Sequence, residues 1–348
     1  MSGRLWALVA LQAAVAVAWK VYAYFQPRLL AHFGFDALAG LLGWYLALAG
    51  STLAPLAGDA SDRLVRSGGD RFPVVRAGVA LAAASFVAVA LTAMAEAGSP
   101  VRFVLPLFVA IWIAGMTVFQ APALAILRDL VRRDEAVGAM APLVVASLLP
   151  TVLWPWVEPV LATLGGSITF LVGGVAVTIT ALALGRTVPM PATASTPDHA
   201  ETSPLVAFAC GIVSAVVAVL AAELVPTMLA RTAAVGVEGL AAVAAVAASS
   251  VAFMGRRVQG LAGERSALLA GAALAVVGRA IAPSCTGSAA AFSVATITGV
   301  GLGLHLTTAL PYLLGGGSRG RAGLVTGLYL GGAMLGSRLV WVIAASLL

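Results

Sequence analysis

Among the ionisable residues inside the long apolar runs of this chain, where a charged group is costly and usually has a function, four are candidates for a functional role. They are Lys20, Glu223, His305 and Arg338. Charges in such places hold ions, move protons or bind charged solutes. No Ser-His-Asp order, catalytic carboxylate pair or nucleotide fingerprint occurs in a suitable context. We therefore expect that the protein is not an enzyme.

The first apolar run predicts one polar helix face. Gln12, Ala16, Lys20 and Tyr24 recur every four residues, so they share a face of a helix. Glu223 lies in the seventh run at a depth similar to that of Lys20, because both runs cross in the same direction. We predict that Lys20 and Glu223 form an ion pair that breaks when a substrate or cation arrives. The alternative is that Lys20 snorkels to the interface and Glu223 is interfacial.

Other polar residues within the runs have two interpretations each. Thr117 and Gln120 in the fourth run are candidate hydrogen-bonding groups. His305 in the tenth run could relay a proton or serve in helix packing. Arg338 in the eleventh run could hold an anionic substrate or a carboxylate, or could anchor the helix at the interface.

Composition argues against metal, cofactor and nucleic-acid sites. The two cysteines, Cys210 and Cys285, are expected on opposite sides of a membrane, and the three histidines form no cluster. We expect no metal site, no cofactor and no disulfide. The net charge of +6 could indicate nucleic acid, but the basic residues are scattered through short connections between apolar runs. Membrane topology explains that pattern better than nucleic-acid binding does.

The composition is that of an all-α membrane protein. Hydrophobic residues make up 61% of the chain and charged residues 10%, against about 25% charged residues in soluble domains. Runs of this length predict transmembrane helices. We expect about eleven, with a twelfth absent or merged into the long tenth run. They lie near 5–25, 38–57, 74–95, 103–127, 136–153, 160–184, 205–229, 240–254, 266–281, 288–314 and 322–347.

Between these spans, charge sets the orientation and polarity marks the domains. Most Lys and Arg residues fall in alternate connections, which places those connections and the N-terminus inside. Residues 154–159 are expected to form an interfacial turn, and residues 255–265 a basic loop. A polar segment at 186–204 predicts a cytoplasmic linker between a six-helix bundle at 1–185 and a bundle of about five helices at 205–348. Basic loops recur after the second and eighth spans, which indicates two parallel repeats.

The charged loop expected after the second span, at residues 58–76, resembles a known motif. The major facilitator superfamily carries Gly-x-Leu-Ala-Asp-Arg-x-Gly-Arg-Lys between its second and third helices, on the cytoplasmic side. Gly58, Asp62, Arg63 and Arg66 match, whereas Ser61, Val65 and Ser67 depart from the motif. The linker position and the two-half layout agree with the same family. The resemblance implies a two-bundle membrane fold in which spans 1, 4, 7 and 10 line a central cavity.

The resemblance also implies a role for Asp62. This carboxylate can accept hydrogen bonds from a helix N-terminus and pair with an arginine, and in the family it braces the two halves in the outward-open state. We expect Arg128, at the end of the fourth span, to be its partner. The alternative is that the charges of this loop only enforce topology.

The function implied by the resemblance is secondary active transport. A small solute would cross the membrane by alternating access, with H⁺ or Na⁺ as a coupling ion. The second hypothesis is a scaffold or assembly factor with the same fold and no transport activity, for example for pigment–protein complexes. Expected partners are the solute and the lipid bilayer, with no nucleic acid. The protein is expected to be a monomer in the inner cell membrane.

Overall fold

A computed structural model describes residues 3–96, 98–187, 202–233, 235–316 and 319–347. These residues form helices and no strand. The first half contains α1 (Gly3–His32), α2 (Leu38–Arg66), α3 (Phe72–Ala93), α4 (Leu105–Leu130) and α5 (Ala136–Thr187). The second half contains α6 (Pro204–Val219), α7 (Val225–Ala233), α8 (Val237–Ala262), α9 (Glu264–Ile281), α10 (Ser288–Gly315) and α11 (Ala322–Leu347). Most of the predicted linker lies outside the described residues.

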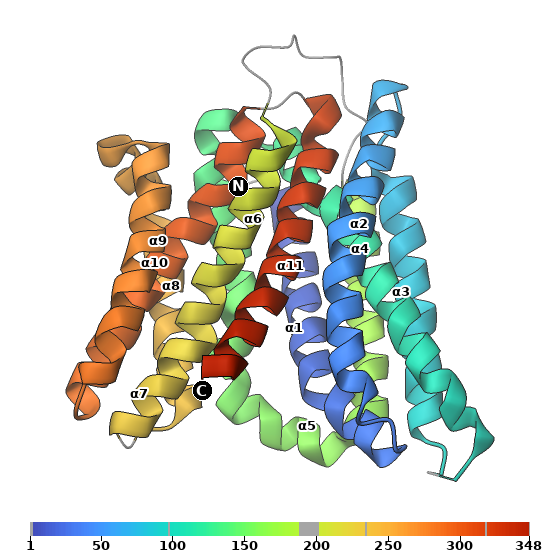
Figure 1. Cartoon of the computed structure of the whole chain (residues 1–348). Helices are drawn as coiled ribbons and strands as arrows, with labels where there is room; N and C mark the ends of the chain where they lie inside the picture. The colour runs from blue at the N-terminus through green and yellow to red at the C-terminus, as the bar shows by residue number, and fades with distance from the viewer. Residues whose placement is uncertain (1–2, 97, 188–201, 234, 317–318, 348) are drawn as a thin grey trace.

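Ten helical segments in the described residues are long and apolar enough to cross a membrane. One of them, α5, supplies two passes, because its backbone turns at Gly165, which has a φ of 77°. Figure 1 shows α5 descending, bending at the lower edge and returning. The described residues therefore form eleven passes, which agrees with the prediction of about eleven in an all-helical membrane protein.

The turn inside α5 does not lie where the sequence analysis put it. Residues 154–159 were expected to be an interfacial turn, but Pro155 and Pro159 lie within the helix and the chain turns at Gly165. A glycine adopts positive φ without steric cost, so it can reverse the chain there. The shift keeps Trp154 in a buried position on the first pass of α5.

The charged loop expected at residues 58–76 is also mostly helical. Helix α2 continues to Arg66, and α3 begins at Phe72. The break comes at Ser67–Arg71, where Gly68 has a φ of 86°. The sequence becomes polar from Gly58 onward, but the residues that follow still form helix. The point where α2 leaves the membrane and the point where the helix ends are therefore different. The loop predicted at 255–265 behaves in the same way, since α8 runs to Ala262.

The seventh pass is one span with an irregular centre. Helices α6 and α7 are joined by a π-helical turn over Leu220–Leu224. Such turns are rare and often occur at functional sites. This one contains Glu223, and Pro226 follows it.

The two halves meet along two helix pairs. Helix α2 packs against α11, and the first pass of α5 packs against α8. Figure 1 shows α11 between α6 and α2, so it contacts both halves. Small residues allow this close approach: Gly58 packs directly against the backbone of Gly323, and Gly327 against that of Ala54.

Candidate functional site

Asp62 of α2 binds the beginning of α11. Its side chain is fully buried. Its Oδ1 accepts a hydrogen bond from the backbone N–H of Gly323 at 2.9 Å, and its Oδ2 accepts one from Leu324 at 2.8 Å. The first N–H groups of a helix lack partners within the helix and carry the positive end of its dipole. The carboxylate therefore satisfies the N-terminus of α11 and joins the first half of the chain to the second.

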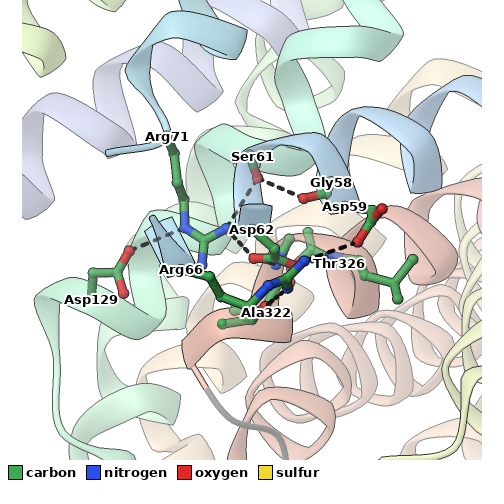
Figure 2. A network of polar contacts seen from close by, with 12 residues as sticks. Gly58, Asp59, Ser61, Asp62, Arg66, Arg71, Asp129, Ala322 and Thr326 are labelled. Carbon is green, nitrogen blue, oxygen red and sulfur yellow. Dashed lines mark hydrogen bonds and ion pairs between the residues drawn. The ribbon is translucent and has the colours of Figure 1, made fainter. Parts of the chain in front are cut away.

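A buried arginine completes this contact. The Arg71 guanidinium donates hydrogen bonds to Asp62 and, at 3.0 Å, to the hydroxyl of Ser61. Its Nε lies 3.2 Å from the carboxylate of Asp129, at the end of α4. Arg71 is 2% exposed. Figure 2 shows Arg71 between the two carboxylates. We call Asp62, Arg71, Asp129 and the N-terminus of α11 the lock.

The residues selected from the sequence take different places around the lock. Gly58 provides the close approach, because a Cβ atom there would meet the backbone of Gly323. Arg66 donates a hydrogen bond to the Gly320 carbonyl, just before α11. Arg63 pairs with Asp59 on the exposed surface, where an ion pair contributes about 0–1 kcal/mol.

Sequence reasoning expected Arg128 as the partner of Asp62 and missed Arg71. Arg128 lies in the last turn of α4, beside the lock residue Asp129. Its participation in the lock stays a prediction. One signal pointed to Arg71: it follows Gly-Gly-Asp and stands two residues before Pro73, which places it directly before the start of α3. Charge counting could not distinguish it from its exposed neighbours.

A cavity of about 540 Å³ lies between the two halves, on the side of the lock toward the C-terminal end of α11. Its wall is mostly apolar and includes one acidic and one basic side chain, Glu223 and Arg338. The remaining lining residues come from α2, α6, the π turn, α10 and α11: Gly43, Leu46, Ser214, Ala215, Ala218, Val219, Ala222, Leu306, Tyr329, Leu330, Ala333, Met334, Ser337 and Trp341.

Glu223 reaches this cavity from the π turn. Its carboxylate lies in the cavity wall with Trp341, and it interacts electrostatically with Lys20. Lys20 lies close enough for that interaction, but the ion pairs of the described residues do not include a direct contact between the two. The Lys20 ammonium lies 4.9 Å from the ring centroid of Trp154. The structure thus brings the predicted pair into electrostatic range and stacks Lys20 on an aromatic ring.

Arg338 joins the halves at the end opposite the lock. Its Nη2 donates a hydrogen bond to the Gly40 carbonyl of α2 at 3.2 Å, and its guanidinium lies 5.2 Å from the ring of Trp44. Its Nε is buried and has no partner among the described residues. Because Arg338 also lines the cavity, its guanidinium can bind an anionic or carbonyl group there.

Both ring nitrogens of His305 form hydrogen bonds with neighbouring helices. Its Nδ1 donates to the Leu268 carbonyl at 3.2 Å, and its Nε2 lies 2.9 Å from the Ser214 hydroxyl. His305 therefore connects α10 to α9 and α6. These bonds give it a packing role, and Ser214, which lines the cavity, places it one hydrogen bond from that space.

The other predicted polar residues of the pathway lie in the first half. Gln12 donates to the Ser147 hydroxyl at 2.8 Å, which ties α1 to α5. Tyr24 packs edge-to-face on Trp154, whose ring also contacts the Lys20 ammonium. Thr117 bonds a carbonyl of its own helix. Gln120 is buried, and its amide nitrogen has no partner in the described part of the chain. No three His, Cys, Asp or Glu side chains of the described residues could hold a metal ion together.

Comparison with solved structures shows which fold this is. The chain matches the human organic anion transporter MFSD10 with a TM-score of 0.73 at 16% identity, covering 100% of this chain and 94% of that one. A bacterial homologue of the iron transporter ferroportin, in an outward-facing state, gives 0.74 at 16% identity, with 100% and 93% covered. The transporter FucP in its outward conformation gives 0.69 at 15% identity, with 99% and 91% covered. No protein-family model and no curated protein matches the sequence. The chain thus has the major facilitator superfamily fold.

Proposed function

We propose that this protein is a secondary transporter that moves a small solute across the inner membrane by alternating access. The lock is the observation that carries the proposal. It joins α2 and α4 of one half to α11 of the other, at one end of a cavity that lies between the halves. A contact that must break before the cavity can open at that end is what alternating access requires.

The state described here has the lock closed. Asp62 and Arg71 make all of the contacts given above, so the lock end is shut. Two of the solved structures with the same fold are outward-facing, which agrees with a lock on the cytoplasmic side. Positive charge in the alternate connections supports the same orientation, with the N-terminus inside.

The cavity favours a small organic solute that carries an ionised group. Its wall is apolar apart from Glu223, Arg338 and a few hydroxyls. Arg338 offers a positively charged guanidinium to an anionic group. Glu223 offers a carboxylate to a cation, which can be the coupling H⁺ or Na⁺ or a cationic group of the solute. The Lys20 ammonium lies within electrostatic range of Glu223 and would weaken its hold on a cation when the two approach.

The test is flux into proteoliposomes. Sugars, amino acids, organic anions and organic cations are first screened by thermal shift, since a ligand that binds the folded state raises apparent stability. Those that bind are then measured for uptake with an imposed H⁺ or Na⁺ gradient. Uptake that depends on a gradient supports the proposal. Absence of both binding and flux across the panel, together with a protein partner that co-purifies, would favour the scaffold hypothesis instead.

A further inference from the structure

A crevice on the second half is open where the equivalent place on the first half, beside Phe170, is filled to a remaining volume of about 10 Å³. In the first half, the second pass of α5 packs between α1 and α3, where Phe170 contacts Phe25 of α1 and Phe86 of α3. The repeat places the seventh pass (α6 to α7) and α9 at the positions of α1 and α3. Between these two elements the described chain leaves a crevice of about 220 Å³.

The wall of this crevice is apolar apart from Thr227 and Arg279. Three helical elements contribute to it: the seventh pass, α9 and α11. The lining residues are Leu220, Leu224, Thr227, Met228, Arg279, Val340, Ile343 and Ala344. Arg279 is the one charged member, and no carboxylate lines the crevice. Glu223, although close in sequence, lines the central cavity instead.

Arg279 is a cation for which the described part of the chain supplies no partner. It makes no hydrogen bond or ion pair with any described residue, whereas Arg28 and Arg338 at the same end of the protein bind backbone carbonyls and aromatic rings. Arg279 lies two residues before the end of α9, on the end opposite the lock. At 1.5 Å per residue it lies about 22 Å along the helix from Glu264. In a hydrocarbon layer of about 30 Å, the long Arg279 side chain can extend from there to the lipid headgroups of the far interface.

We propose that this crevice binds an anionic phospholipid, with the phosphate on Arg279 and an acyl chain along the apolar wall. The guanidinium can bind phosphate oxygens with two parallel hydrogen bonds. A single positive charge without a neighbouring acid favours a lipid with net negative charge over a zwitterionic one.

The test measures lipid binding to the purified full chain by native mass spectrometry, with phosphatidylglycerol and phosphatidylcholine as probes. Arg279→Gln is expected to weaken phosphatidylglycerol binding roughly ten-fold, because a hydrogen bond to a charged group is lost. Arg231→Gln is the matched control: it removes an exposed arginine from the neighbouring helix α7, outside the crevice. Ala344→Leu narrows the crevice and keeps the charge, and it is also expected to weaken binding.

Three results would overturn the proposal. One is phosphatidylglycerol binding that is unchanged in Arg279→Gln, or reduced equally in Arg231→Gln. Another is a thermal shift with inorganic phosphate alone that matches the shift with lipid and is lost in Arg279→Gln, which would identify a free-anion site. The third is a co-purifying membrane protein that cross-links to the crevice. Melting temperatures in phosphatidylcholine confirm that each variant is folded.

Discussion

Replacing Asp62 with Asn tests the lock directly. The substitution preserves shape but removes the charge that faces Arg71 and the N-terminus of α11. Breaking a buried ion pair by neutralising one partner costs about 3–5 kcal/mol. Here Arg71 keeps Asp129, and the Asn carbonyl still accepts one hydrogen bond, so we expect the closed state to lose about 2–3 kcal/mol. The lock-open population should then rise about 30- to 150-fold.

Maleimide labelling of a buried reporter cysteine measures that population. Ala125 on α4 is fully buried in the cluster that joins α4 to α10 and α11 at the lock end. Ala125→Cys, in a background with Cys210 and Cys285 replaced, should be labelled slowly, and Asp62→Asn should raise its rate by the factor above.

Two controls sharpen the result. Arg63→Gln removes an exposed ion pair from the same helix and should leave the rate unchanged. Arg71→Gln combined with Asp62→Asn removes the buried uncompensated charge, so the double variant should open less than the sum of the single effects predicts. A rate in Asp62→Asn equal to that of the parent would refute the claim that these contacts hold the lock end shut.

Three further variants probe the seam and the cavity. Gly58→Val places a branched side chain against the backbone of Gly323. The reporter cysteine at the lock end should then be labelled at least as fast as in Asp62→Asn. Gly138→Val, at an open position, is the control and should leave the labelling rate unchanged. Glu223→Gln should abolish gradient-driven uptake while solute exchange across the membrane continues; loss of both to the same degree would instead mean that Glu223 binds the solute. Arg338→Gln should weaken thermal-shift binding of anionic solutes at least ten-fold and leave binding of neutral ones intact, and an equal loss for both kinds would contradict its role as an anion site.

The sequence predicted the fold well because hydrophobicity and length determine transmembrane helices almost alone. It misplaced the boundaries for a physical reason. At Gly58 the residues become polar because helix α2 leaves the membrane, not because it ends, and at Trp154–Pro159 prolines and aromatic residues sit within a helix that turns only at Gly165. The hydrophobicity pattern indicates whether a residue lies in water or in lipid, whereas the backbone conformation determines where a helix ends.

The site could be predicted only in part. Asp62 was found because its charge is unusual at that place, and Glu223 and Arg338 because charges inside apolar runs are rare. Arg71 was not found, since its burial depends on where α2 and α4 end relative to α11. The π turn that presents Glu223 and the stacking of Lys20 on Trp154 depend on contacts between distant segments, which periodicity does not report.

Distance measurements by spin labelling test the central claim most directly. One pair, at Ser67 and Leu261, spans the two halves at the lock end, and a second pair, at Ala31 and Thr232, spans them at the opposite end; all four residues are exposed. Alternating access predicts that Asp62→Asn lengthens the first distance and shortens the second. If both distances lengthen together, or neither changes, the halves do not rock about the cavity and the account is contradicted.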